Sequence, residues 1–409
     1  MTKSRALVGG VIVLYFVIAL EVLIMISPFA AFFYTAFNPV LLFFAQGPAT
    51  RWLAAFFLPH MVLPPGLFLQ AVRVAGSVLF VGGTVMFLGC AVQVYSHKLL
   101  RRGPALGGLY AWIRHPQYLA LGLTGLGLAI LWPRFLTLAL WSIMVALYYL
   151  LARDEERRML GQFGDQYREY MTRTGMFLPR RMEKVLDRLP SPRSPALQRS
   201  LGFVLLLTLS IGGGFALRAY TVSRLPLWSQ GRVAAMAVLP ADGIMLEHRM
   251  ADVLKLPAVQ SRLARDSGLV LVYLVPQQYV MQGMIADIGP EWRLYEHHQT
   301  LAMIWDWVFH PFRHLQGGGH MAMAGHVSMP GHMPGMAAPA EPGNGVVRRL
   351  IFLRIASPGP AADAASLFAI NAVRVPQFFV DVDIRNLVQL DMSDLGPGTG
   401  WGNVPTPMF

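Results

Sequence analysis

The sequence has few charged residues and almost no cysteine. Only 14% of its 409 residues are charged, whereas 55% are hydrophobic; soluble domains are about one quarter charged. This composition excludes an ordinary cytosolic domain, a disordered chain and a coiled coil. The single cysteine, Cys90, lies in an apolar run, so an intramolecular disulfide and a multi-cysteine metal site are both excluded. A disulfide-stabilised secreted scaffold is excluded for the same reason.

Negative charge is scarce in only one half of the chain. Residues 1–221 contain 21 lysines and arginines against 8 aspartates and glutamates, whereas residues 222–409 contain 13 against 14. The positive excess gathers in residues 98–114 and 153–199, between apolar runs. This arrangement is typical of the cytoplasmic loops of a membrane protein rather than of a nucleic-acid surface. We therefore expect the lipid bilayer as a partner and no nucleic acid.

Five apolar runs are candidates for membrane-spanning helices. They are Leu7–Ser27, Val74–Tyr95, Tyr118–Trp132, Leu136–Ala152 and Leu201–Ala219. A spanning helix needs about 20 apolar residues, which the first two runs supply comfortably. The third and fourth are shorter, and the few residues between them predict a tight helical hairpin. Five crossings from a cytoplasmic N-terminus place both basic clusters inside the cell and the C-terminal part outside, as in a bacterial inner-membrane protein with a periplasmic domain.

The N-terminal region leaves alternatives open. The first run is longer than the apolar core of a signal peptide, about 7–15 residues, which favours a retained helix over a cleaved signal. Glu21 within it is either a functional residue or a carboxylate that reaches a polar partner near the outer interface. The aromatic-rich stretch Pro28–Arg73 is interrupted by prolines such as Pro39 and Pro48. We predict an interfacial or re-entrant segment there, on the outer side.

The residues with the greatest chemical potential lie between positions 107 and 179. Arg114–Pro116 precede the third apolar run, and Asp154–Glu156 follow the fourth. Because the two runs form a hairpin, we expect these residues to meet at one cytoplasmic rim. Gly122, Gly125 and Gly127 would permit close helix packing or the approach of a ligand. Each of these features, taken singly, also fits a purely structural role.

Taken together, the order GxYxxxRHPxY, two apolar helices, EE, FGxxYxxY and FxP resembles the isoprenylcysteine carboxyl methyltransferase and phospholipid methyltransferase superfamily. The resemblance covers about residues 70–180. It implies S-adenosylmethionine bound at the cytoplasmic end of the hairpin and a lipophilic substrate that arrives from the bilayer. His115 and Arg114 are the implied catalytic residues. The implied cofactor-binding residues are Tyr110, Arg114, His115, Pro116, Tyr118, Gly125, Gly127, Glu155, Glu156 and Tyr167.

These residue types suit methyl transfer from a sulfonium donor. The glutamates can accept hydrogen bonds from the ribose or the ammonium group, and Arg114 and His115 can face the carboxylate of the cofactor. Tyrosine faces can stabilise the sulfonium by about 0.5–2 kcal/mol. The acceptor, a carboxylate, a thiol or an amine, stays open. A carboxylate would not need His115 as a base, whereas a thiol or an ammonium group would.

The remainder of the chain predicts a second module. The fold class is an all-α transmembrane bundle of about five spanning helices followed by a small α+β extracytoplasmic domain. We divide the chain into a methyltransferase-like core at 1–179, a basic cytoplasmic linker at 180–200, a transmembrane helix at 201–221 and the external domain at 222–409. In that domain we expect a helix over Asp242–Arg265 and irregular coil over Gly396–Phe409. The expected strands are Gly268–Val275, Leu350–Ile355, Ala369–Val375 and Phe378–Ile384.

A histidine- and methionine-rich loop at 314–336 stands apart from the rest of the domain. Four histidines recur every six residues, and five methionines lie among them and directly after the last. Imidazole and thioether groups without thiolates suit copper. An aromatic-rich helix expected upstream would hold Glu296–His298 and His310. The candidate metal ligands are His310, His314, His320, Met321, Met323, His326, Met329, His332, Met333 and Met336; alternatively, the loop is a low-complexity segment with incidental metal affinity.

Two functions of different classes follow. The first is an integral membrane methyltransferase whose external domain adds regulation or contact with a protein or metal partner. The second is a membrane-anchored copper-handling protein built on a methyltransferase-like scaffold. The presence of the motif residues together favours the first, because a core that had lost its activity would be expected to lose some of them.

Overall fold

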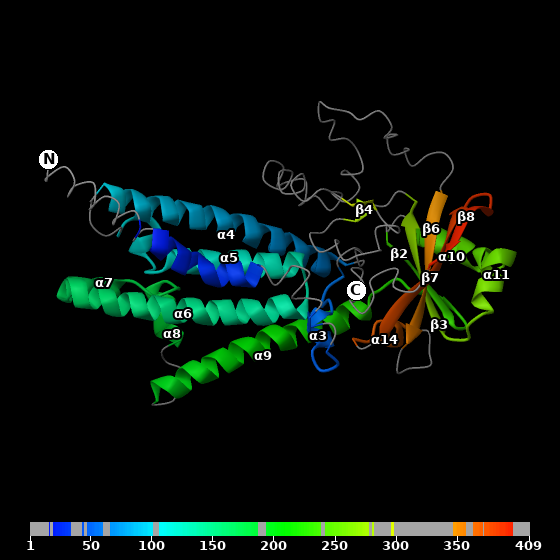
Figure 1. Ribbon diagram of the computed structural model, residues 1–409. Coiled ribbons are helices and arrows are strands. Elements are labelled where there is room, and N and C mark those ends of the chain that lie inside the picture. The colour runs from blue at the N-terminus through cyan, green and yellow to red at the C-terminus, as the bar shows by residue number, and fades with distance from the viewer. Residues whose placement is uncertain are drawn as a thin grey trace, which may run out of the picture. The chain divides into compact units, whose positions relative to one another are not determined.

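The computed structural model describes residues 16, 19–33, 43–44, 47–59, 66–100, 106–186, 194–238, 242–277, 280–281, 296–297, 347–356, 363–370 and 372–395. The chain divides into two compact units. The first comprises Met1–Thr35, Val78–Ala129 and Thr137–Ile211, and the second comprises Ala36–Ser77, Ile130–Leu136 and Gly212–Phe409. The first unit is helical, and the second contains a mixed sheet (Figure 1).

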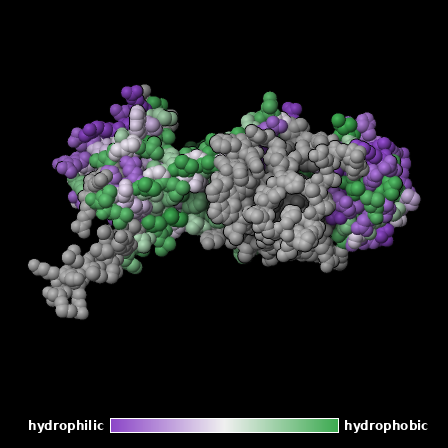
Figure 2. All heavy atoms as spheres, turned by 90° about the horizontal axis from the view of Figure 1, so that it is seen from above, coloured by the Kyte–Doolittle hydropathy of each residue, from purple (hydrophilic) through white to green (hydrophobic). Residues whose placement is uncertain are grey.

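Four of the five apolar runs lie in helices, as predicted. These helices are α4 (Leu67–Leu99), α5 (Pro116–Leu131), α6 (Phe135–Phe163) and α9 (Pro195–Val222). Among the described residues, α4, α6 and α9 are long and apolar enough to cross a membrane. Helix α5 has 16 residues and is therefore only about 24 Å long. Hydrophobic atoms cover much of the helical part, and hydrophilic residues gather at the end where α7 (Asp165–Arg173) lies (Figure 2).

The first apolar run differs from the prediction. Its described helix, Ala19–Phe33, continues through Pro28 instead of ending at Ser27. Glu21, near the start of this described helix, forms an ion pair with Lys98 at the end of α4. The two residues therefore share one end of the first unit. Because Lys98 belongs to the basic cluster expected on the cytoplasmic side, this ion pair does not fit the alternative in which Glu21 reaches a polar partner near the outer interface.

The expected linker at 180–200 is also partly helical. Helix α8 (Arg180–Leu186) begins directly after Pro179, and α9 already begins at Pro195. Both helices start next to a proline, whose fixed backbone angle suits the first turn of a helix. Only residues 187–193 of the linker lie outside the described residues. The basic residues of this region are thus mounted largely on helices.

Close packing between α4 and α5 depends on Gly83. A Cβ atom at this position would lie 2.7 Å from the backbone nitrogen of Thr124 and 2.9 Å from the carbonyl oxygen of Ala120. Backbone atoms cannot move aside as a flexible side chain can, so only glycine permits this approach. The neighbouring Gly82 faces open space.

We predict that Gly83→Ala lowers the free energy of unfolding by about 1–3 kcal/mol, because the added methyl group separates two helix backbones. Thermal unfolding of the purified full chain in detergent measures this loss. Gly82→Ala is the matched control and should keep or slightly raise the melting temperature, because alanine favours helix over glycine. Equal melting temperatures for the two variants would show that α4 and α5 do not touch at Gly83.

The second unit contains a six-stranded mixed sheet. Its order is β1 (Trp228–Gln230), β2 (Val233–Ala237), β3 (Leu269–Pro276), β6 (Val347–Ala356), β7 (Val373–Asp383) and β8 (Val388–Asp394). Strands β2 and β3 are parallel and joined through helices α10 (Gly243–Val253) and α11 (Pro257–Leu263); the other neighbours are antiparallel. Residues of α10 and α11 pack on one face, and Leu225, Leu367 and Phe368 pack on the other. Both faces of the central strands are therefore buried.

The predicted elements of this unit are confirmed in part. Strands β3 and β6 match the expected ones, whereas the expected helix at 242–265 is two helices, because Pro257 starts a new one. The two expected strands at 369–384 are a single strand, β7, in which Pro376 lies at a register shift. A proline lacks the N–H of a regular ladder and is tolerated at such a bulge. Short helix α14 (Ala364–Leu367) precedes this strand.

The region before the histidine- and methionine-rich loop also differs where it is described. Glu296–His297 form strand β5, which pairs in parallel with β4 (Val280–Met281), so these residues are not helical as expected. All ten candidate metal ligands between His310 and Met336 lie outside the described residues, as do residues 396–409.

The segment at 47–58 packs against the turn between α5 and α6 in the second unit. Short helix α3 (Arg51–Ala54) leads into a buried stretch, and Phe56 forms a bridge with Arg134. The Arg134 guanidinium lies 3.9 Å from the centre of the Phe56 ring and donates a hydrogen bond to the Ala54 carbonyl. Arg134 is therefore buried against protein groups, and residues 54–58 of the stretch predicted as interfacial or re-entrant are buried as well.

Candidate functional site

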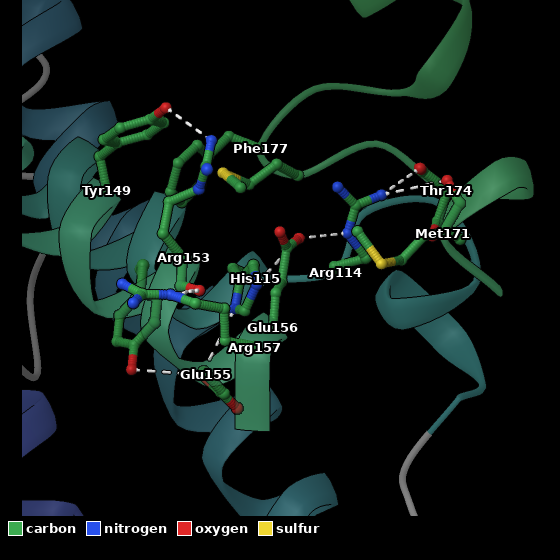
Figure 3. A network of polar contacts seen from close by, with 12 residues as sticks. Arg114, His115, Tyr149, Arg153, Glu155, Glu156, Arg157, Met171, Thr174 and Phe177 are labelled. Carbon is green, nitrogen blue, oxygen red and sulfur yellow. Dashed lines mark hydrogen bonds and ion pairs between the residues drawn. The ribbon is translucent and has the colours of Figure 1, made fainter. Parts of the chain in front are cut away.

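The hairpin of α5 and α6 brings the predicted charged residues together. Arg114 and His115 directly precede α5, which begins at Pro116, and Glu155 and Glu156 lie on the part of α6 that continues beyond its apolar stretch. The four side chains form one network of polar contacts (Figure 3). The predicted meeting of these residues at one rim of the hairpin is confirmed.

Arg114 is held by groups of the protein itself. Its Nε donates to Glu156 Oε1 at 2.5 Å, and its Nη1 donates to the carbonyl oxygens of Met171, at 3.3 Å, and Thr174. The side chains of Arg114 and Glu156 are each only 8% exposed. This buried pair fastens the segment after α7 to the hairpin. These contacts occupy the Nε and Nη1 atoms of Arg114, and its expected place facing a cofactor carboxylate stays a prediction.

A short backbone pairing completes this wall of the site. The amide of Arg114 donates to the carbonyl of Gly175 at 2.8 Å, and the amide of His115 donates to that of Met176 at 3.1 Å. Glu183, on α8, accepts a hydrogen bond from the Met176 amide at 2.6 Å. The FxP motif after α7 is thereby fixed beside His115, where Phe177 lies with its ring centre 6.1 Å from the imidazole.

His115 is the most deeply buried of the four polar residues. The residue is 2% exposed, and within the described part of the chain neither ring nitrogen has a hydrogen-bond partner. Its Nδ1 lies 3.5 Å from Glu155 Oε2 and its Nε2 lies 3.6 Å from Glu156 Oε1, both longer than a usual hydrogen bond. Burial alone would lower the pKa of His115, but the two carboxylates outweigh it and raise the pKa above its usual value. The imidazole is therefore more readily protonated than a free histidine.

This raised pKa predicts a pH-dependent contribution to stability. Because the folded chain binds the proton more tightly than the unfolded chain, the contribution is complete below the unfolded pKa of about 6.5 and is lost as the pH rises through the folded pKa. We expect the melting temperature in detergent to fall over this interval for the wild-type chain and to fall less for His115→Gln. The exposed His248 on α10 provides the control His248→Gln, which should keep the wild-type slope. The same slope in all three proteins would contradict a raised pKa at His115.

The predicted tyrosines surround the same network. Tyr118 stacks on His115 with ring centres 5.6 Å apart, and its hydroxyl lies 3.4 Å from Glu155 Oε2. Tyr110 donates to the side-chain oxygen of Gln117 at 2.8 Å. Tyr167 is buried, with its ring centre 5.7 Å from that of Tyr170. Burial first, and then the nearby carboxylates, raise the pKa of Tyr167, so its hydroxyl stays neutral.

Two predicted residues lie elsewhere. Gly125 is ten residues beyond His115, which corresponds to about 15 Å along a helix. A Cβ atom there would lie 2.6 Å from the Met144 side chain and 3.0 Å from that of Trp141, so the space is already filled by α6. Gly127 is buried in α5 as well. Gly125 therefore serves helix packing, and the structure does not bring either glycine to the polar network.

Sequence reasoning missed the residues that shape the segment after α7. A Cβ atom on Gly175 would collide with the carbonyl oxygen of Leu178, so this turn requires glycine. Thr174 supplies a carbonyl to Arg114, and Glu183 supplies a carboxylate to two backbone amides. A glycine placed two residues before the FxP motif was the one available signal. The hydrogen bonds to backbone carbonyls and amides cannot be predicted from residue types, because every residue has a carbonyl group and every residue except proline has an amide N–H.

An apolar groove adjoins the network. It has a volume of about 530 Å³ and lies between α5, α6 and α9. Tyr118 and Phe177, the two rings nearest His115, both line it. The polar cluster thus opens onto a largely hydrophobic space within the first unit.

No family model, curated protein or solved structure matches this chain. The described residues contain no group of three or more histidine, cysteine, aspartate or glutamate side chains that could hold a metal ion. The geometry of the polar network, and the motifs from which it is built, are therefore the basis on which a function is proposed.

Proposed function

We propose that the protein is an integral membrane enzyme that transfers a methyl group from S-adenosylmethionine to a lipophilic acceptor in the bilayer. The observation that carries this proposal is the meeting of His115, Glu155 and Tyr118 beside an apolar groove. It joins groups suited to a charged, polar cofactor with a space suited to an apolar substrate. In the proposed topology five helices cross a bacterial inner membrane, with the N-terminus and the polar network in the cytoplasm and the sheet domain in the periplasm.

Some residues of the network suit groups of this cofactor, and the others hold them in place. Glu155 has a side chain that is 37% exposed, so its carboxylate can accept hydrogen bonds from a ribose or an ammonium group. The ring faces of Tyr118 and Phe177 can stabilise a sulfonium cation. His115, buried and without a hydrogen-bond partner in the described part, can donate to a carboxylate. Arg114 and Glu156 satisfy each other and hold these groups in place.

When bound, the cofactor supplies an activated methyl group on a positively charged sulfur. The chain's own residues then orient the reactants and exclude water, which supplies most of the acceleration in a displacement of this kind. The two carboxylates raise the pKa of His115, so its imidazole holds a proton more tightly than a free histidine does. Of the three acceptors considered, a carboxylate, a thiol and an amine, the carboxylate is already deprotonated at neutral pH and needs no base.

Transfer of a labelled methyl group tests the proposal. We expect membranes that contain the chain to move label from methyl-labelled S-adenosylmethionine into the lipid extract. Glu155→Gln should lower the rate about tenfold or more, because it removes charged hydrogen-bond acceptors from the open side of the network. Glu169→Gln is the matched control, since Glu169 is exposed and, among the residues described, its carboxylate pairs with Arg173 on α7 alone. Incorporation that is equal with and without the chain would contradict the proposal.

Copper handling remains the second prediction from sequence. The ten candidate ligands, from His310 to Met336, lie outside the described residues, so the structure does not bear on this function. Copper as a cofactor, and a protein or metal partner outside the cell, remain hypotheses based on residue types alone.

A further inference from the structure

One wall of the groove beside the polar network is formed by a helix that lies outside residues 70–180, the stretch that resembles the methyltransferase superfamily. Helix α9 follows the motif-bearing core and lines the groove with Gly202, Phe203 and Leu206. Only 6% of the most apolar stretch of α9 is buried, so this helix stands largely free of the rest of the first unit. The groove is thus formed where a candidate membrane-spanning helix leaves space beside α6.

The middle of the groove suits an apolar chain. A Cβ atom on Gly202 would meet nothing within 4 Å, and one on Gly122 would touch only a methyl group of Val145, at 3.9 Å. The volume of about 530 Å³ lies within the usual range for ligand sites, about 300–1,000 Å³. Helices α6 and α9 are both long and apolar enough to span a membrane. A groove between two such helices would be surrounded by lipid, so we expect a lipid chain as its occupant.

One end of the groove is positively charged. Helices α6 and α9 run in opposite directions (Figure 1), so Tyr149, the last α6 residue that lines the groove, and Arg199, early in α9, line the same end. The Nε of Arg199 donates to the Pro195 carbonyl at 3.0 Å, and within the described part of the chain no carboxylate pairs with its guanidinium. Arg153 adds a second cation, 3.4 Å from the Tyr149 hydroxyl (Figure 3). Glu155 lies outside the lining of the groove, with its Oε2 3.4 Å from the hydroxyl of Tyr118, which does line it.

We propose that this groove binds a long-chain carboxylate, with the chain between α6 and α9 and the carboxylate beside Arg199. Arg199, which lines the groove, and Arg153, which contacts the lining residue Tyr149, complement the negative head group, and the apolar walls complement the chain. Glu155 stays on the side of the network that would hold the cofactor. The inference that this carboxylate is the methyl acceptor rests on the proposed function. The binding of the carboxylate in the groove does not.

Photoaffinity labelling of the purified full chain in detergent tests the inference. The probe is a 16-carbon fatty acid that carries a diazirine near its methyl end. We expect label on α6 and α9 residues of the groove, and displacement by palmitate at concentrations about tenfold lower than by hexadecanol or hexadecylamine. Equal displacement by all three competitors would overturn the assignment of a carboxylate.

Two variants locate the site. Gly202→Phe should reduce labelling about tenfold or more, because the ring fills the groove, whereas Gly213→Phe on the same helix should leave it unchanged. A Cβ atom at Gly213 also meets nothing within 4 Å, but Gly213 does not line the groove. Arg199→Gln should weaken displacement by palmitate without changing displacement by hexadecanol, a result independent of how Gly202→Phe folds. Labelling that is insensitive to both Gly202→Phe and Arg199→Gln would overturn the site.

These measurements separate the two proposals. Labelling needs no cofactor, so a groove that behaves as expected in a chain that does not bind S-adenosylmethionine would support the lipid site and contradict methyl transfer. Conversely, a chain that binds the cofactor but shows no selective labelling would leave methyl transfer in place and overturn the groove as the acceptor site.

Discussion

Arg114→Met is expected to lower the free energy of unfolding by about 3–5 kcal/mol, because it leaves the buried Glu156 carboxylate without its partner. The change also removes the donor to the carbonyls of Met171 and Thr174, which hold the segment after α7 against the hairpin. That segment carries Phe177, so methyl transfer should be lost together with stability. Thermal unfolding in detergent and the labelled-methyl assay measure the two effects.

Arg173→Met is the matched control for this prediction. Arg173 pairs with Glu169 at 2.6 Å, but the two side chains are 70% and 69% exposed. An exposed pair contributes about 0–1 kcal/mol, so this variant should remain near the wild-type melting temperature. The double variant Arg114→Met/Glu156→Met should recover part of the lost stability, because it removes the unpaired charge. Similar melting temperatures for Arg114→Met and Arg173→Met would contradict a buried clamp.

Arg218→Met should have the largest effect in the second unit. Arg218 lies near the end of α9, is 6% exposed, and donates to the carbonyl oxygens of Phe56 and Phe368. It thereby joins the segment after α3 to the residue that follows α14. Each buried carbonyl that loses its donor costs about 1–3 kcal/mol. We expect a marked fall in melting temperature and faster proteolysis of the sheet domain.

Arg224→Met provides the comparison, since Arg224 lies at the same end of α9 and contacts only the Tyr220 ring, at 5.5 Å, among the interactions described. A cation over an exposed ring contributes about 0.5–1 kcal/mol, so this variant should change little. If Arg218→Met unfolds and is digested like Arg224→Met, the two carbonyl contacts do not hold this unit together.

Long apolar runs made much of the helical part predictable. Their length and the short turn at Pro133 indicated the hairpin, and the hairpin then placed residues 114–116 near 154–156. The end of the first run is predicted wrongly at Ser27, because Pro28 suggests the end of the helix. A proline is tolerated inside a membrane helix, although it would end a helix in water. The extent of α6 beyond its apolar residues depends on polar contacts at its end, which hydropathy does not report.

The sheet domain was harder to read because its strands carry mixed signals. Strand β2 has the sequence VAAMA, whose alanines favour helix but which is buried on both faces of the sheet. Strand β8 is largely exposed and polar, so it lacks the apolar alternation of a half-buried strand. Strand β7 contains Pro376, which suggested two strands rather than one. Long-range pairing decides all three cases.

The membership of the site was predictable, but the roles within it were not. Motif order was enough to group His115 with Glu155, whereas the division of labour between Glu155 and Glu156 follows from exposure, which differs between neighbouring positions on one helix. The role of Arg114 depends on carbonyl groups about 60 residues away. Backbone acceptors of this kind carry no signature in the sequence.

Direct binding of S-adenosylmethionine to the purified full chain, measured by calorimetry in detergent, tests the central claim most directly. We predict saturable binding of one molecule per chain, weakened about tenfold or more by Glu155→Gln and unchanged by Glu169→Gln. Heat that shows no saturation with the wild-type chain, or equal affinity for all three proteins, would contradict a methyl-donor site at this end of the hairpin.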